Sequence, residues 1–250
     1  MNVQEFVDRA GWSAERKAVE EMRLAEELDF AANRTGEHSF ALLAAKKRYK
    51  GWNWMRGSVG EKQLAMGLAG LPPIGSFEWS LEVDLLESPE SERNLDALLI
   101  GERIVVFDAK AWAEPMSIVD GMIGWGSRPV ESLDKLEDQR KAVQGVVARL
   151  GFAGVRVHLA VVQIGQIPSQ RGLIAPEISL IGLSDLEALM QLLHHDLSST
   201  GDRLGWEDAR QLAWELPHYL VSAQTASAGI QPTNDLCPIC GSLGGLCMGP

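Results

Sequence analysis

Three ionisable side chains interrupt two apolar segments near the middle of the chain. Residues 94–110 read NLDALLIGERIVVFDAK, in which Asp96, Asp108 and Lys110 stand among leucine, isoleucine and valine residues. A buried charge needs a partner charge, water or a metal to compensate it. Carboxylates beside a lysine suit phosphodiester hydrolysis. The carboxylates bind Mg²⁺ or Mn²⁺, the metal lowers the pKa of a bound water, and the lysine positions that water or stabilises the charged transition state.

Strand geometry decides whether these three side chains share a face. Asp108 and Lys110 are two residues apart and point the same way. A two-residue loop at Gly101–Glu102 turns Asp96 to the other face, whereas a three-residue loop that includes Arg103, or a β-bulge, places Asp96 opposite Asp108. If the three side chains form one site, the turn between the two strands must have an odd length or contain a bulge. A two-residue turn would contradict a common site.

Two further polar residues lie on apolar helix faces. Glu61 shares a face with the apolar residues that follow it at i+3, i+4 and i+7, so its carboxylate is predicted to point inward. Gln139 lies three residues after Leu136 and four before Val143, and its amide is predicted to reach the same site.

Three segments resemble one known family. Residues 57–61 (GSVGE), 94–101 (NLDALLIG) and 105–112 (VVFDAKAW) are similar to the NERD (nuclease-related) domain, whose pattern has a Gly-x-x-Gly-Glu helix, an Ile-Asp-His strand and an Asp/Glu-x-Lys strand followed by Trp. The resemblance covers roughly residues 57–165. That family belongs to the PD-(D/E)xK nuclease-like superfamily, so the resemblance implies a restriction-endonuclease-like core.

The resemblance also implies residue roles. Glu61, Asp96 and Asp108 are expected to ligate the metal and Lys110 to be catalytic, while Gln139 is a weaker match to the polar residue on the next helix. The chain departs from the family at two positions, with Ala97 in place of the usual His and Leu95 in place of the usual Ile. Neither departure removes a ligand, but the loss of the His is expected to alter how substrate is handled.

A basic and aromatic segment precedes the Gly-x-x-Gly-Glu motif. Residues 46–56 (KKRYKGWNWMR) contain no acid, and cations bind phosphates while flat rings stack on bases. The alternative is a helix end whose tryptophans pack into the core. The nucleic-acid hypothesis assigns Lys46, Lys47, Arg48, Lys50, Trp52, Trp54 and Arg56 to DNA binding.

The C-terminal tail holds all three cysteines. Cys237, Cys240 and Cys247 include a Cys-x-x-Cys-Gly turn typical of a zinc knuckle. His218 and Asp235 are candidates for a fourth Zn²⁺ ligand, and two chains sharing one metal is another solution. The alternative is three free thiols.

Hydrophobic patterning predicts the elements that position these residues. The predicted fold is α/β, a mixed central sheet flanked by helices, with an N-terminal helical arm and a C-terminal helical cap. Helices are predicted at 1–50, 58–70, 132–150, 184–198 and 206–222, and strands at 77–86, 94–100, 104–110 and 155–164. The predicted divisions are an arm at 1–56, a nuclease-like core at 57–182, a cap at 183–222, and a linker with the cysteine-rich tail at 223–250.

Composition narrows the classes of function. The net charge of −11 over 250 residues argues against binding nucleic acid with the whole surface, but it leaves room for a local basic site. The sequence has neither a run of about 18 apolar residues nor a secretory signal, so neither a membrane span nor export is expected. The small number of cysteines favours a reducing cytoplasm.

Two functions from different classes follow. The leading hypothesis is a Mg²⁺-dependent (endo)deoxyribonuclease, a hydrolase acting on ester bonds of DNA, with endonuclease and exonuclease action both left open. The alternative is a catalytically inactive nuclease-fold protein that binds nucleic acid or builds a larger assembly, such as a phage particle, with the arm docking on a protein partner. An active enzyme needs the polar side chains beside an open cleft. In an inactive relic, Asp108 is paired with Lys110 and no room is left for phosphate.

Overall fold

The computed structural model describes residues 3–72, 80–82, 95–120, 122–125, 128–195 and 203–227. Within these residues helices and strands follow one another as a mixed α/β fold. The helices are α1 (Val3–Arg9), α2 (Trp12–Thr35), α3 (His38–Ala69), α4 (Leu133–Arg149), α5 (Leu186–His195) and α6 (Trp206–Ser227), with a 3-10 turn at Leu183–Asp185. The strands are β1 (Ser80–Glu82), β2 (Ala97–Ile100), β3 (Ile104–Lys110), β4 (Met116–Val119), β5 (Met122–Trp125), β6 (Arg128–Ser132), β7 (Val157–Gln163), β8 (Gly172–Ala175) and β9 (Ile178–Gly182).

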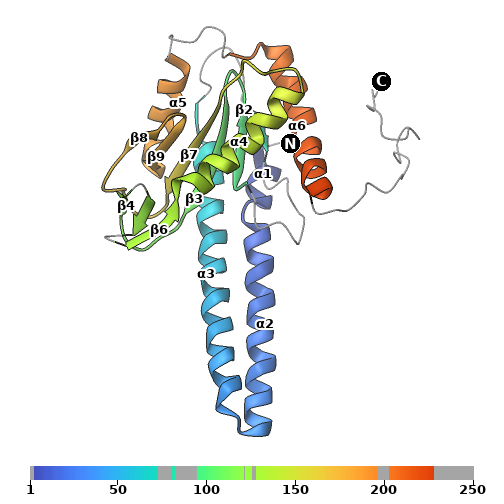
Figure 1. Cartoon of the computed structure of the whole chain (residues 1–250), viewed down its shortest axis with the longest axis vertical. Coiled ribbons are helices and arrows are strands. Elements are labelled where there is room, and N and C mark those ends of the chain that lie inside the picture. The colour runs from blue at the N-terminus through green and yellow to red at the C-terminus, as the bar shows by residue number, and fades with distance from the viewer. Residues whose placement is uncertain are drawn as a thin grey trace, which may run out of the picture.

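The helices α2 and α3 form a long antiparallel hairpin that projects from the rest of the molecule (Figure 1). Gly36 ends α2 in the left-handed conformation (φ 71°), and its N–H donates to the carbonyl of Ala32. The buried residues between the helices are mostly small, so the two backbones approach closely. A Cβ on Gly51, for example, would lie 3.0 Å from Cγ of Met22. The small buried residues are Ala14, Ala18, Ala25, Ala44, Gly51 and Ser58.

One continuous helix carries both the basic segment and the Gly-x-x-Gly-Glu motif. The prediction of a separate short helix at 58–70 is wrong, because α3 runs for 32 residues from His38 to Ala69. Glycine inside a helix costs about 1 kcal/mol relative to alanine. Here Gly51 and Gly60 are sites of close packing, against α2 and against Ala111 respectively, and this packing offsets the cost.

The larger sheet has the strand order β1-β2-β3-β7-β9-β8. It is mixed, since β2 and β3 pair antiparallel whereas β3, β7 and β9 pair in parallel. Every residue of β7 is buried, as expected of a central parallel strand covered on both faces. The predicted mixed sheet flanked by helices is confirmed.

Helices cover both faces of this sheet. On one face, Leu98, Val106 and Leu159 pack with residues of α4 and α6 in one apolar cluster. On the other face, Leu99 and Phe107 pack with residues of α1, α5 and the C-terminal third of α3. The arm is therefore built into the core at its base, and the two helices predicted as a single cap lie on opposite faces of the sheet.

Sequence patterns missed several elements. A second sheet, with strand order β4-β5-β6, lies between β3 and α4 in the chain, and β8 and β9 extend the main sheet. The predicted linker from residue 223 begins as helix, since α6 continues to Ser227. Of the strand predicted at 77–86, only 80–82 lies within the described residues. Among the described helices, none is both long and apolar enough to cross a membrane.

Candidate active site

The turn between β2 and β3 has three residues, so the predicted odd-length turn is confirmed. Ile100 pairs with Ile104 and Ala97 with Phe107, and this register continues to place Asp96 opposite Asp108. The turn is held from outside by Glu102, whose carbonyl accepts the N–H of Leu204 at 3.0 Å. Its carboxylate Oε2 lies 2.8 Å from Nδ1 of His194.

Asp96 is held at the end of the β2–β3 pair that lies opposite the turn. Its Oδ2 accepts the backbone N–H of Ala109, the residue after Asp108, at 2.6 Å. Asp96 directly precedes Ala97, the first residue of β2, so it stands at the end of that strand. This hydrogen bond therefore ties the first carboxylate to the strand that carries the second carboxylate and the lysine.

Asp108 and Lys110 share a face of β3 and form an ion pair. Nζ of Lys110 lies 2.9 Å from Oδ2 and 3.1 Å from Oδ1 of Asp108. Both side chains are largely buried, with 12% and 16% of their surfaces exposed. The lysine thus compensates a carboxylate that is otherwise costly to bury.

Glu61 reaches the same place from α3. The buried residues Leu64, Ala65 and Leu68 follow Glu61 on its helix face, in agreement with the predicted inward orientation. Gly60 allows this approach, because a Cβ there would lie 2.8 Å from the Cβ of Ala111, just beyond the end of β3. The helix and the strand end are therefore in direct contact beside the carboxylates.

The pKa of Asp96 is raised well above its usual value. Burial is the largest cause, and the negative charges of Glu61 and Asp108 add to it. The hydrogen bond from Ala109 and the charge of Lys110 act in the opposite direction but do not outweigh these effects. The charges of Glu61 and Asp108 thus oppose the ionisation of Asp96, an electrostatic situation that a bound cation would relieve.

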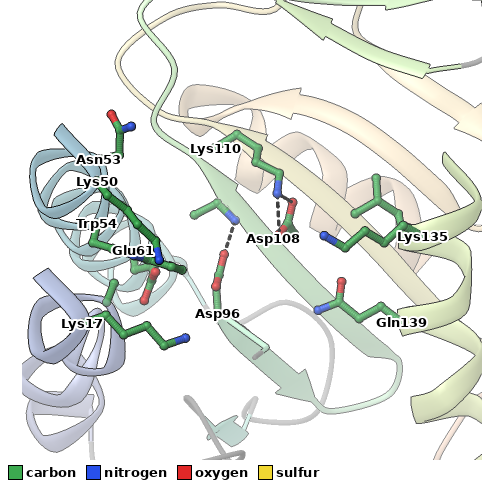
Figure 2. A pocket seen from close by; sticks show the side chains of 14 residues that line it. Lys17, Lys50, Asn53, Trp54, Glu61, Asp96, Asp108, Lys110, Lys135 and Gln139 are labelled. Carbon is green, nitrogen blue, oxygen red and sulfur yellow. Dashed lines mark hydrogen bonds and ion pairs between the residues drawn. The ribbon is translucent and has the colours of Figure 1, made fainter. Parts of the chain in front are cut away.

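These side chains line a cavity of about 460 Å³ between the base of the hairpin and the sheet (Figure 2). Figure 2 shows Asp96 in the middle, with α2 and α3 on one side and α4 on the other. Gln139 lines the cavity from α4, together with Lys135 one turn earlier. The lining residues are Ala14, Lys17, Lys50, Asn53, Trp54, Gly57, Glu61, Asp96, Asp108, Ala109, Lys110, Lys135, Leu136 and Gln139.

The structure divides the basic and aromatic segment. Lys50 and Trp54 line the cavity, whereas Lys46, Lys47, Arg48, Trp52 and Arg56 do not. Lys47 pairs with Glu21 of α2, Arg48 pairs with Asp29, and Arg56 donates to the carbonyl of Ala111 at 3.0 Å. Because the segment is helical, only one stripe of it faces the site.

Three polar residues of the cavity escaped the sequence analysis. Lys135 lies four residues before Gln139 and so shares its helix face, which is a signal that the pattern contained. Asn53 lies next to Trp54 and is exposed. Lys17 belongs to α2, and only the pairing of α2 with α3 brings it to the site.

The donor set suits a hard divalent cation. Glu61, Asp96 and Asp108 offer only oxygen atoms, which Mg²⁺ and Mn²⁺ prefer. No three acidic, His or Cys side chains of the described residues stand close enough to form a ready-made metal site. The negative charges of Glu61 and Asp108 contribute, after burial, to the raised pKa of Asp96, so the three side chains lie within electrostatic range of one another and offer the oxygen donors that such a cation would take. The zinc prediction at Cys237, Cys240 and Cys247, with His218 or Asp235, lies outside the side chains that the structure describes.

Comparisons of the chain with protein-family models, curated proteins and solved structures find no match.

Proposed function

We propose that this protein is a Mg²⁺- or Mn²⁺-dependent nuclease that hydrolyses phosphodiester bonds of DNA, with a restriction-endonuclease-like core of the NERD type. The observation that carries the proposal is the three-residue turn, which brings Asp96 to Asp108 and Lys110 beside a cavity that Glu61 also lines. This is the constellation that the resemblance implies for a metal-dependent nuclease.

Each side chain has a chemical task in this proposal. Glu61, Asp96 and Asp108 hold the metal, which when bound supplies a Lewis acid and a water of lowered pKa. Lys110 positions the attacking water or stabilises the charge that grows on the phosphate. Gln139 and Lys135 contribute an amide and a cation from the opposite wall. The small number of cysteines favours a cytoplasmic location for such an enzyme.

One observation favours the alternative function. Asp108 is paired with Lys110, as expected for an inactive nuclease fold that binds nucleic acid or builds a larger assembly, inside a virion for example. The cavity beside the pair favours the enzyme, because it leaves room for a phosphate. The helical hairpin would be the docking surface for a protein partner in the alternative.

Cleavage assays separate the two functions. Purified protein is incubated with supercoiled plasmid and with single-stranded DNA in Mg²⁺ or Mn²⁺, and cleavage that EDTA abolishes is expected. Asp108→Asn and Lys110→Met should each lower the rate at least 100-fold. The matched controls Asp138→Asn and Lys141→Met lie on the solvent side of α4 and should leave the rate unchanged. Absence of cleavage, together with absence of metal binding by calorimetry, would favour the inactive fold.

A further inference from the structure

The cavity continues from the carboxylates toward the arm along one stripe of α3. Trp54 and Glu61 are seven residues apart, so they share a helix face two turns apart, about 10.5 Å along the axis. Figure 2 shows Trp54, Lys50 and Lys17 on the side of α2 and α3, together with Glu61 and away from Lys110 and Lys135. The residues of the stripe are Lys50, Asn53, Trp54, Gly57 and Glu61.

At this end an aromatic ring is combined with a cation. Nζ of Lys17 lies over the ring of Trp54, 4.7 Å from its centre. Such a contact is weak for a cation that water can reach, and an ammonium–phosphate hydrogen bond is stronger. A base that stacks on Trp54 would displace the ammonium of Lys17 toward the neighbouring phosphate. The ring would then bind the base of a nucleotide, and the ammonium would bind its phosphate.

Lys50 adds positive charge at the same wall. Glu21 is largely buried and pairs with both Lys50, at 2.6 Å, and Lys47, at 2.9 Å. Burial acts to raise the pKa of Glu21, but hydrogen bonds from Lys50 and Lys47 outweigh it, so the pKa is lowered. Glu21 is thus shared between two ammonium groups, and the one on Lys50 also lines the cavity with Trp54.

We propose that Trp54, Lys17 and Lys50 form a nucleotide subsite that stacks one unpaired base and holds the adjacent phosphate, so that the preferred substrate is single-stranded DNA. This inference rests on the proposed function, since it specifies the substrate of the same site. A cavity of about 460 Å³ is of the size that holds one small ligand. Bases in a duplex are already stacked on both faces, so only an unpaired base can use the ring of Trp54.

The test compares two tryptophans of one helix. A fluorescein-labelled 12-nucleotide oligo(dT) and its duplex with oligo(dA) are titrated with the full chain in EDTA, and binding is followed by fluorescence anisotropy. The wild type should bind the single strand at least tenfold more tightly than the duplex. Trp54→Leu should weaken single-strand binding about tenfold, because one stacked base is lost. Trp52→Leu, which alters an exposed ring outside the cavity, should change binding less than twofold.

A second pair of variants tests the phosphate contact. Lys17→Met should reduce the slope of log K against log[salt] by about 0.7, the value for one phosphate contact on a single strand. Lys46→Met, at an exposed position of α3 outside the cavity, should leave the slope unchanged. Circular dichroism and thermal melting establish that each variant is folded before it is titrated.

The outcomes separate the subsite from the catalytic proposal. Preferential duplex binding, equal effects of Trp54→Leu and Trp52→Leu, or equal effects of Lys17→Met and Lys46→Met would overturn the subsite even in an enzyme that cleaves DNA. Single-strand binding that depends on Trp54 and Lys17 supports the subsite, also in a protein that does not cleave, because the titration needs neither metal nor hydrolysis. In that case only the catalytic proposal fails.

Discussion

Nζ of Lys110 lies 2.9 Å from Oδ2 of Asp108, two residues earlier on the same strand. Both groups are largely buried, and the lysine also acts to lower the pKa of Asp96. In the metal-free protein, the charge of Lys110 therefore stabilises the ionised forms of both Asp108 and Asp96. A substitution of Lys110 should change the stability of the fold and the pKa of Asp96.

Lys110→Met should lower the free energy of unfolding by about 1–3 kcal/mol, because Asp108 then keeps a buried charge without its compensating cation. The double variant Asp108→Asn/Lys110→Met should recover most of that loss. Urea denaturation of the wild type, both single variants and the double variant in EDTA gives the coupling energy. Equal stability of the wild type and Lys110→Met would show that solvent screens the pair.

Asp96 should make the metal-free protein less stable as the pH rises. A carboxyl whose folded pKa is raised contributes stability that is fully present below the unfolded pKa and is lost as the pH rises through the folded pKa. The loss therefore begins near 3.8 and extends upward to the raised pKa. Asp96→Asn should remove this decline, which urea denaturation at a series of pH values in EDTA measures. An identical decline in the variant would assign it to another group.

Metal binding should release the proton of Asp96. Mg²⁺ binds the ionised carboxylate, so binding should strengthen as the pH rises through the raised pKa and should release protons below it. Calorimetric titrations with Mg²⁺ in two buffers of different ionisation enthalpy count those protons. Lys141→Met serves as a control, since its side chain is 63% exposed outside the cavity. The same proton count in Asp96→Asn would contradict the assignment.

Gly60→Ala should separate α3 from the end of β3. The added methyl would lie 2.8 Å from the Cβ of Ala111, so the helix must shift and take Glu61 with it. We expect a stability loss of about 1–3 kcal/mol and a fall in cleavage rate.

Gly57→Ala is the matched control on the same helix. Its methyl finds only Glu61 Oε1 at 4.0 Å, and it should stabilise the helix by about 0.5–1 kcal/mol. Thermal melting of both variants distinguishes close contact from helix propensity.

Protonation of His158 should destabilise the folded protein as the pH falls. Burial lowers the pKa of His158 to about 4, and the charges of Arg140 and Arg103 add to this effect. A group with a lowered folded pKa contributes stability that is present above the unfolded pKa, 6.5, and is lost as the pH falls through the folded pKa. About 3 kcal/mol should be lost between these values. His158→Gln should flatten the acid side of the stability profile, whereas an unchanged profile would exclude this histidine.

The sequence predicted the centre of the site better than its walls. The positions of Asp96, Asp108 and Lys110 follow from the two-residue period of strands and the length of one turn, both of which are local properties. Glu61 and Gln139 follow from helix periodicity in the same way. Lys17 could not be predicted, because its place depends on which face of α2 meets α3, and that pairing is a tertiary property.

The missed elements have equally specific causes. The strands of the small sheet are short, and Gly124 and Pro129 within them are residues that strands usually avoid. Hydrophobic patterning predicted two helices where α3 runs unbroken from His38 to Ala69. Three glycines of α3 face neighbouring side chains, and these contacts are not visible in the sequence. The three are Gly51, Gly60 and Gly67.

The continuity of α3 also constrains how this chain can change length during evolution. One inserted residue rotates everything beyond it by about 100° around the helix axis, so an insertion between Lys50 and Glu61 would turn Trp54 and Lys50 away from the carboxylates. An insertion of seven residues keeps the angular phase but moves the two ends apart. Matched insertions near Gly36 lengthen only the tip of the hairpin. Related chains should therefore differ freely in arm length while keeping a fixed spacing between the aromatic and the acidic ends of the stripe.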